Sequence, residues 1–254
     1  MPTSTAETQQ RTTVRTHDGL RLAGTLVAPE PEPKRAVLLL HGEGSTSDQG
    51  GFYARLSAEL AERGVASLRF DLPGHGDSEG RQEDLTLSGL LNTIGAGLAH
   101  LRDHVTAAPA TLLATGLTGG VAAGYAARRG QEVDRLVLIN PLIDYQEHFA
   151  DSRPGWPAEL CASDRLRVSP TFAVGRAMLN EVFWLQPRGA LGAIAAPTLI
   201  IHGAGPTTVP LTSSQTAAEA LTCASRLVEI NGPQAPHWQA PAIREVTEWI
   251  LPAR

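Results

Sequence analysis

Short, continuous apolar runs alternate along the chain with longer segments in which apolar residues recur at helical spacing. Continuous apolar runs are typical of strands that are buried on both faces, as in a parallel sheet covered by helices. The predicted strands are Thr12–Thr16, Leu20–Ala28, Ala36–Leu40, Val65–Phe70, Thr111–Ala114, Leu136–Ile139, Thr198–Ile201 and Arg226–Ile230. The predicted helices are Tyr53–Arg63, Leu87–His104, Val121–Arg129, Thr212–Leu221 and Ala242–Leu251. This order predicts an α/β fold with a mostly parallel, doubly wound sheet of eight strands.

Two regions depart from this alternation. The first two predicted strands flank Asp18-Gly19, a strong turn signal that predicts an N-terminal antiparallel hairpin. Residues 141–190 are long and mixed, without a clear strand, and they follow the end of a predicted strand. A lid over a pocket would lie at such a place. We therefore expect a single domain over residues 1–254, with a small lid insertion at about 141–190.

Residues 114–122, Ala-Thr-Gly-Leu-Thr-Gly-Gly-Val-Ala, have the glycine frame of a nucleophile elbow. In the pattern Gly-x-Ser-x-Gly, the serine stands on a sharp turn between a strand and a helix. Gly116 and Gly120 take the glycine positions, and Thr118 stands where the serine is expected. The extra methyl group and the positive φ of such a turn both oppose a β-branched nucleophile. These costs favour Thr118 as a pocket wall and leave its role as a nucleophile open.

Three further motifs follow predicted strands, and together with the elbow they resemble the α/β-hydrolase superfamily. The residues that carry the resemblance are Leu38–Gly44, Arg69–Ser78 and Pro197–Gly203. They are similar to the oxyanion loop, the Asp-x-x-Gly-x-Gly-x-Ser stretch and the strand before the acid residue of the serine-aminopeptidase-like and cinnamoyl/feruloyl-esterase-like branch. The resemblance covers nearly the whole chain and implies acyl transfer to a serine and then to water. It also implies oxyanion donors at the backbone N–H groups of Glu43 and Gly119.

The catalytic triad that the resemblance implies is altered at all three positions. Thr118 replaces the serine, and Pro206 stands where the acid is expected. His237, the histidine nearest to the expected base, lies two or three residues late. It is either a displaced base that reaches the pocket or a residue at the start of the last helix. We therefore expect a degenerate triad and very slow ordinary ester hydrolysis.

Glu43 offers a different chemistry at the same place. A side-chain anion beside a developing oxyanion would oppose ester hydrolysis. A carboxylate whose pKa is raised by burial could instead act as a general base on a C–H or O–H group. Other ionisable residues in the strand-end motifs are expected to brace loops through hydrogen bonds, and these are His41, His75, His202, Asp71 and Asp77.

Three functions remain open. The favoured one is an α/β-hydrolase-fold enzyme that acts on a carbonyl-containing small molecule or peptide by a non-standard mechanism, of isomerase, epimerase, cyclase or lyase type. The alternatives are an esterase, thioesterase or acyltransferase that uses Thr118 with His237, and a non-catalytic ligand-binding protein. The predicted catalytic residues are Thr118, His237 and Glu43, and the predicted oxyanion or substrate-binding residues are Gly42, Glu43, Leu117 and Gly119.

Composition narrows the range of partners. The net charge of −5 and the lack of a Lys/Arg cluster argue against nucleic acid. No apolar run reaches the roughly 20 residues of a membrane helix, and the first residues lack a signal-peptide core, so we expect a cytoplasmic protein. Cys161 and Cys223 have no zinc spacing and no phosphate-cradling glycine loop occurs, so no metal or organic cofactor is expected. The oligomeric state stays open.

Overall fold

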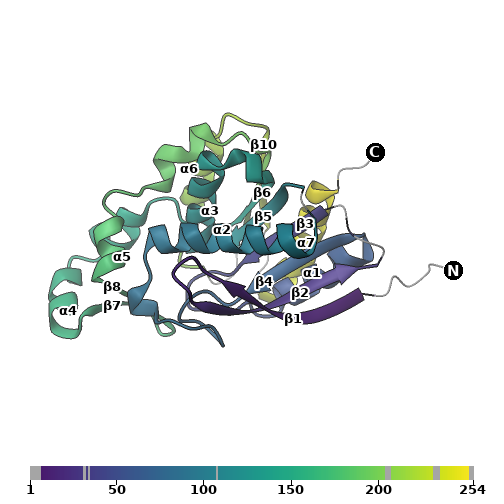
Figure 1. Ribbon diagram of the computed structural model, residues 1–254. Helices are drawn as coiled ribbons and strands as arrows, with labels where there is room; N and C mark the ends of the chain where they lie inside the picture. The colour runs from purple at the N-terminus through teal and green to yellow at the C-terminus, as the bar shows by residue number, and fades with distance from the viewer. Residues whose placement is uncertain are drawn as a thin grey trace.

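A sheet of eight strands, in the order β1-β2-β4-β3-β5-β6-β9-β10, runs through the middle of the molecule (Figure 1). The structure is a computed structural model and describes residues 7–30, 33, 35–106, 108–203, 207–230 and 235–251. The strands are β1 (Glu7–Arg15), β2 (Arg21–Pro29), β3 (Arg35–Leu40), β4 (Val65–Phe70), β5 (Ala110–Thr115), β6 (Val133–Ile139), β9 (Thr198–Gly203) and β10 (Ser225–Ile230). β2 pairs antiparallel with β1 and β4, and the other pairs of this sheet are parallel. The predicted fold class is confirmed, including the N-terminal hairpin.

Helices cover both faces of the sheet. α1 (Phe52–Glu62) and α7 (Ala235–Ile250) share one apolar cluster, whereas α2 (Leu87–His104), α3 (Leu117–Arg128) and α6 (Leu211–Ala220) belong to the other. The short 3-10 helices η1 (Gln82–Asp84) and η2 (Gly130–Glu132) lie in the connections. Two helices begin earlier than predicted: α3 begins at Leu117 instead of Val121, and α7 begins at Ala235 instead of Ala242.

The buried strand β3 shows how the apolar runs build two cores at once. Successive side chains of a strand point to opposite faces of the sheet. Leu38 and Leu40 accordingly lie in the cluster with α2 and α3, while Val37 and Leu39 lie in the cluster with α1 and α7. All four side chains are fully buried. A run with no polar residue is therefore what this central position requires.

The segment between β6 and β9, which we call the cap (residues 141–193), has more structure than its sequence suggested. It contains a π-helix η3 (Glu147–Asp151), the helices α4 (Trp156–Ser163) and α5 (Arg176–Glu181), and the 3-10 helix η4 (Pro187–Ala193). It also contains an antiparallel hairpin of β7 (Arg165–Ser169) and β8 (Phe172–Gly175). The prediction of a stretch without a strand was therefore wrong. In Figure 1 the hairpin, α4 and α5 lie at the end of the molecule that is remote from both termini.

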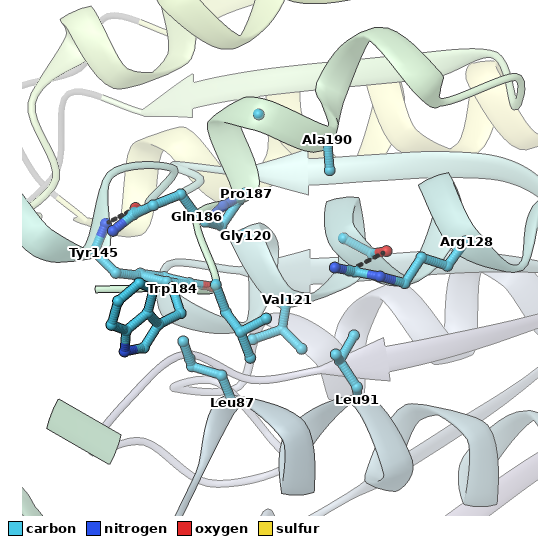
Figure 2. Close-up of a pocket in the computed structure, with 13 residues that line it drawn as sticks. Leu87, Leu91, Gly120, Val121, Arg128, Tyr145, Trp184, Gln186, Pro187 and Ala190 are labelled. Carbon is cyan, nitrogen blue, oxygen red and sulfur yellow. Dashed lines mark hydrogen bonds between the residues drawn. The ribbon is translucent and has the colours of Figure 1, made fainter. Parts of the chain in front are cut away.

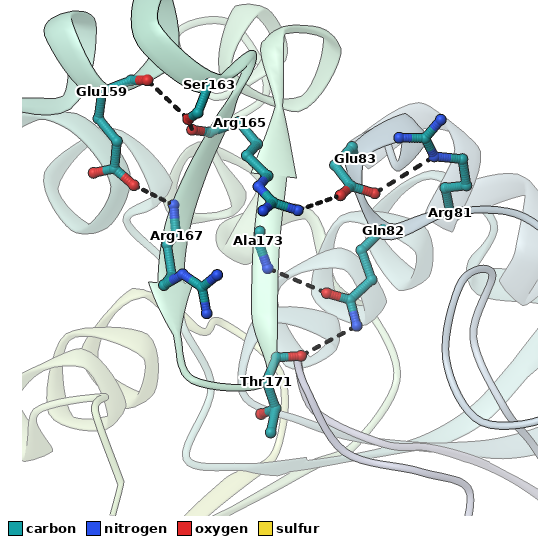
Figure 3. A network of polar contacts seen from close by, with 9 residues as sticks. All are labelled: Arg81, Gln82, Glu83, Glu159, Ser163, Arg165, Arg167, Thr171 and Ala173. Carbon is teal, nitrogen blue, oxygen red and sulfur yellow. Dashed lines mark hydrogen bonds and ion pairs between the residues drawn. The ribbon is translucent and has the colours of Figure 1, made fainter.

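Polar contacts dock this hairpin onto η1 (Figure 3). The side chain of Gln82 donates to the carbonyl oxygen of Thr171 at 3.1 Å and accepts from the N–H of Ala173 at 3.2 Å. Beside it, the Glu83 carboxylate lies 3.3 Å from the Arg165 guanidinium. The inner face of the hairpin is apolar, because Leu166, Phe172 and Val174 are buried. None of the helices in the described part of the chain has the length and apolar character needed to cross a bilayer.

Candidate active site

The sharp turn between β5 and α3 is made by Gly116. This residue has φ 60° and ψ −125°, a combination that only glycine adopts without strain. The strand extends through Thr115 and the helix starts at Leu117, so the tip is the single residue between them. The prediction that Thr118 occupies the tip was therefore wrong by two positions. The tip of this elbow carries no side chain.

The Thr118 hydroxyl faces the interior beneath the turn. The residue is 1% exposed, and its Oγ1 lies 2.9 Å from the Thr115 carbonyl oxygen and 3.0 Å from that of His41. A third carbonyl oxygen, that of Leu40, lies at 3.3 Å. Because its proton is directed at these backbone acceptors, the hydroxyl serves to tie α3 to the end of β3. This position contradicts the prediction of Thr118 as a nucleophile.

Thr118→Val should therefore lower the stability of the fold rather than alter its chemistry. The substitution preserves side-chain volume but leaves buried carbonyl oxygens without their donor, which costs about 1–3 kcal/mol. The free energy of unfolding in urea would measure this loss, with Thr118→Ser as the matched control that retains the hydroxyl. A variant that kept its stability would show that these contacts do not hold the turn.

The carboxyl group of Glu43 lies over the bare elbow tip. Its Oε2 accepts a hydrogen bond from the backbone N–H of Leu117 at 2.8 Å. A Cβ placed on Gly116 would lie only 2.6 Å from the same oxygen. The carboxyl group thus fills the space that a nucleophile side chain would need. The Glu43 carboxyl group and the bare Gly116 are complementary in shape. A serine at position 116 would clash with the carboxyl group.

Burial raises the pKa of the Glu43 carboxyl group above its ordinary value. Hydrogen bonds from the N–H groups of Leu117 and of Glu43 itself favour the charged form and act in the opposite direction. The start of helix α3 adds a favourable dipole for an anion at this place. Since burial is the largest effect, the carboxyl group keeps its proton to higher pH than an exposed glutamate does.

The oxyanion donors also differ from expectation. The N–H of Gly119 donates to the carbonyl oxygen of Gly116 at 3.0 Å, within the first turn of α3, so it is already used. The N–H of Leu117 is the one that faces the site. The prediction of Gly119 as an oxyanion donor was therefore wrong, and the acceptor on Leu117 is the protein's own carboxylate.

A cavity of about 470 Å³ opens above Gly116. Among the described residues, its lining comprises Gly42, Glu43, Ser45, Gln49, Gly50, Thr115, Gly116, Ile139, Asn140, Val168, Ser169, Gly203, Thr207, Thr208, Val209, Trp238 and Gln239. These residues come from the carboxyl ends of strands β3, β5, β6 and β9, from the cap, and from the start of α7. Ligands of open α/β sheets bind at such strand ends. Predicted Gly42 and Glu43 lie here, and Leu117 adjoins through its N–H.

Several polar lining groups are fixed by contacts of their own. Asn140 has a positive φ of 44°, and its Oδ1 accepts from the N–H of Gly203 at 2.8 Å. Gln49 accepts from the N–H of Gly42 at 2.9 Å. The Thr115 hydroxyl lies 2.7 Å from that of Tyr53. These bonds hold the mouth of the cavity in a defined shape.

The other two positions of the expected triad are His237 and Pro206. The backbone of His237 lies in the first turn of α7, as one of the two interpretations of this residue proposed. Its side chain, like Pro206, lies outside the described residues. The neighbouring Trp238 packs on Phe52 with ring centroids 4.9 Å apart and reaches the cavity wall.

The strand-end histidines brace loops, as expected. His41 Nε2 accepts from the N–H of Leu72 at 2.9 Å, and His75 Nε2 accepts from the N–H of Gly44 at 3.2 Å. Burial lowers the pKa of His41 to about 4 and also lowers the pKa of His75. Both rings are therefore neutral acceptors at neutral pH. Asp71 and His202 make contacts of the same kind: the Asp71 carboxylate accepts from the N–H groups of Ser47 and Asp77, and His202 Nδ1 is hydrogen-bonded to the Ser214 hydroxyl. The expected bracing role of the Asp77 carboxylate stays a prediction.

The sequence missed Gly116, Asn140 and Trp238 as site residues. A signal for Gly116 existed, since the tip of an elbow is the first residue after its strand, and the apolar run plus Thr115 ends immediately before it. Asn140 likewise follows β6 directly. Within the described ranges, no group of three or more His, Cys, Asp or Glu side chains is arranged to hold a metal ion.

Comparisons with known proteins agree with this architecture. Est1E from Butyrivibrio proteoclasticus, solved with ferulic acid bound, superimposes with a TM-score of 0.81 at 22% identity, covering 94% of this chain and 98% of that one. Mouse alpha/beta hydrolase domain-containing protein 10 gives a TM-score of 0.76 at 16% identity, over 95% and 98% of the two chains. The architecture is that of the α/β-hydrolase fold.

Comparisons of the sequence identify the family within this fold. A monoacylglycerol lipase from Mycolicibacterium smegmatis is 24% identical over 228 residues, which is 78% of this chain and 79% of the lipase. The sequence model of serine aminopeptidase, S33, matches residues 31–187, more than half of the chain. The chain belongs to this serine aminopeptidase family.

Proposed function

We propose that this chain is an enzyme that moves a proton on a carbonyl-containing small molecule or peptide, in an isomerase-, epimerase-, cyclase- or lyase-type reaction. The observation that carries the proposal is the Glu43 carboxyl group, held 2.8 Å from the Leu117 N–H above a glycine tip. The site has a poised acid-base group where its relatives need a nucleophile. An acyl-enzyme is not required for such chemistry.

Glu43 would act as the base in this scheme. Its carboxylate takes a proton from a carbon next to the substrate carbonyl. The C–H electron pair forms the new C=C bond, and the π pair of the carbonyl moves onto the oxygen to give an enolate. Once protonated, Glu43 accepts the Leu117 N–H less strongly, which frees that donor for the new negative oxygen. The same proton then returns to another position of the substrate. General acid-base help of this kind contributes about 10²–10⁴-fold in rate.

A second candidate is hydrolysis by water that Glu43 activates directly. The family membership and the lipase relative favour it. Here Glu43 takes a proton from water, and the hydroxide attacks the carbonyl carbon to form a tetrahedral intermediate. The intermediate breaks its bond to the ester oxygen, and the leaving alcohol takes the proton back from Glu43, so no covalent enzyme intermediate forms. An esterase that uses Thr118 is not proposed, because its hydroxyl is buried and directed at backbone carbonyls.

Two assays on the purified protein separate these candidates. In the first, aryl ketones and β-keto esters are incubated with the enzyme in D₂O, and exchange at the α-carbon is followed by mass spectrometry. In the second, p-nitrophenyl butyrate turnover and labelling by a fluorophosphonate are measured, the latter by intact mass. We expect exchange without a phosphonyl adduct and without a burst of p-nitrophenol.

Glu43→Gln should slow exchange by about 10²–10⁴-fold, and Thr118→Ser, which keeps the buried hydroxyl, should retain it. Burst-free ester turnover that is lost in Glu43→Gln would favour the second candidate instead. A phosphonyl adduct on a hydroxyl side chain would overturn both. Ligand-induced stabilisation with neither activity would leave the chain as a ligand-binding protein.

A further inference from the structure

A second cavity, of about 180 Å³, lies between α2, α3 and the cap (Figure 2). Its lining includes the apolar side chains of Leu87, Leu91, Val121, Leu185 and the ring of Trp184, and polar and apolar atoms share the exposed surface of the cavity about equally. It shares no lining residue with the cavity above Gly116. Trp184 is 85% exposed, which is unusual for a large apolar side chain. This cavity has no role in the chemistry proposed above.

Most polar side chains of this cavity already have partners. The Tyr145 hydroxyl donates to the carbonyl oxygen of Leu117 at 2.8 Å. The Gln186 amide accepts from the N–H of Tyr145 and donates to the carbonyl oxygen of Val182. These contacts leave the guanidinium of Arg128 as the side chain with donors to spare.

Arg128 lies at one end of the cavity, and Trp184 lies at the other (Figure 2). The Arg128 side chain folds back along α3, with one terminal nitrogen 3.2 Å from the carbonyl oxygen of Gly124. No carboxylate of the described residues lies within ion-pair distance of it. An arginine with free N–H groups is well suited to a carboxylate.

A negative charge lies near the opposite end of the cavity, outside its lining. The Glu181 carboxylate accepts from the N–H of Ser88 at 2.9 Å, directly beside the lining residue Leu87. A ligand with an acidic head would therefore be repelled at this end and attracted at Arg128. From Gly120 to Arg128, helix α3 rises about 12 Å, which sets the length available to a ligand lying along it.

We propose that this cavity binds an amphiphilic carboxylate, namely a medium-chain fatty acid. Its carboxylate pairs with Arg128, and its alkyl chain lies against Leu91 and Val121 toward Trp184. The apolar side chains contribute to binding by burying part of the alkyl chain, and the arginine sets the orientation. The ligand class follows from apolar side chains along the cavity combined with an arginine at one end that has no ion-pair partner among the described residues.

Binding of monomeric sodium decanoate tests the proposal, measured by titration calorimetry and by the fluorescence of Trp184. We expect saturable 1:1 binding, a blue shift that disappears in Trp184→Phe, and an affinity about tenfold or more lower in Arg128→Ala. Arg129→Ala is the matched control, because this neighbouring arginine already lies 3.6 Å from Glu132. Decylamine should bind more weakly than decanoate.

Leu91→Trp provides a second variant that fills the cavity while leaving Arg128 in place. It should abolish decanoate binding, whereas Glu43→Gln in the other cavity should leave the affinity unchanged. The proposal would be overturned by the absence of saturable binding, by equal affinities for decanoate and decylamine, or by an affinity that neither Arg128→Ala nor Leu91→Trp reduces. Sensitivity to Glu43→Gln alone would assign the ligand to the cavity above Gly116.

Discussion

Glu43→Gln should reduce turnover by about 10²–10⁴-fold, because it removes the acid-base group and leaves the cavity and fold intact. The glutamine carbonyl oxygen can still accept from the N–H of Leu117, so the side chain keeps its place. The loss should therefore fall on kcat rather than on KM. The rate measurements are the exchange and ester assays described above. An unchanged kcat would remove Glu43 from the chemistry.

The same substitution should stabilise the folded protein at neutral pH. The pKa of Glu43 is raised in the folded state, so its contribution to stability is fully present below the ordinary value of 4.5 and is lost as the pH rises through the folded pKa. Above that range the folded state carries a buried charge, and glutamine removes this cost.

Thermal unfolding of the two proteins at pH 4 and at pH 8 measures the effect. The melting temperature of Glu43→Gln should exceed that of the parent at pH 8, by about 2–4 °C for each kcal/mol gained. The difference should shrink at pH 4, where the glutamate is protonated. A glutamine variant that is less stable at pH 8 would show that the hydrogen bonds to the carboxylate outweigh its burial. In that case the proposed acid-base role of Glu43 would carry no cost in the free energy of unfolding.

Gly116→Ser should destabilise the fold by about 1–3 kcal/mol and fail to create a working nucleophile. The left-handed φ of 60° strains any L side chain, and the new Cβ would lie 2.6 Å from the Glu43 carboxylate. The serine and the carboxylate cannot share the space above the turn. The variant should therefore remain unreactive toward a fluorophosphonate.

Removing the glutamate side chain as well should recover part of this loss. We expect Glu43→Ala/Gly116→Ser to be more stable than the sum of the two single variants predicts, with a coupling of about 0.5–3 kcal/mol. Urea unfolding of all four proteins gives this value directly. Additive effects would mean that the two positions do not compete for space. Gly124→Ser, on the same helix, is a control without contact to Glu43.

The fold could be predicted because its central strands are buried on both faces. Residues 36–40 and 198–201 are almost purely apolar, and only a strand between two helical layers uses such a sequence. The hairpin β7–β8 was not predicted because its strands are short. Its alternating Arg-Leu-Arg-Val pattern was the signal, with Leu166 on the buried face.

The site was predicted in outline and misplaced in register. The glycines at 116 and 120 place the centre of the pattern at Thr118, whereas the end of β5 places the tip at Gly116, between Ala114 and Thr118. Glu43 was predicted as a candidate base through its position in the loop after β3. That its carboxylate reaches the N–H of Leu117, 74 residues away, depends on the packing of two strand ends. No local pattern encodes such a contact.

The neutral imidazoles of His41 and His75 make the loops around Glu43 sensitive to acid. An unfolded chain takes up protons at these histidines from about pH 6.5 downward, whereas folded His41 resists protonation until about pH 4. Between these values, unfolding is accompanied by proton uptake and becomes progressively easier. Each ring also accepts an N–H bond, from Leu72 or from Gly44, that a protonated ring cannot accept. Acidification should therefore release the loops after β3 and β4 together, ahead of the rest of the sheet.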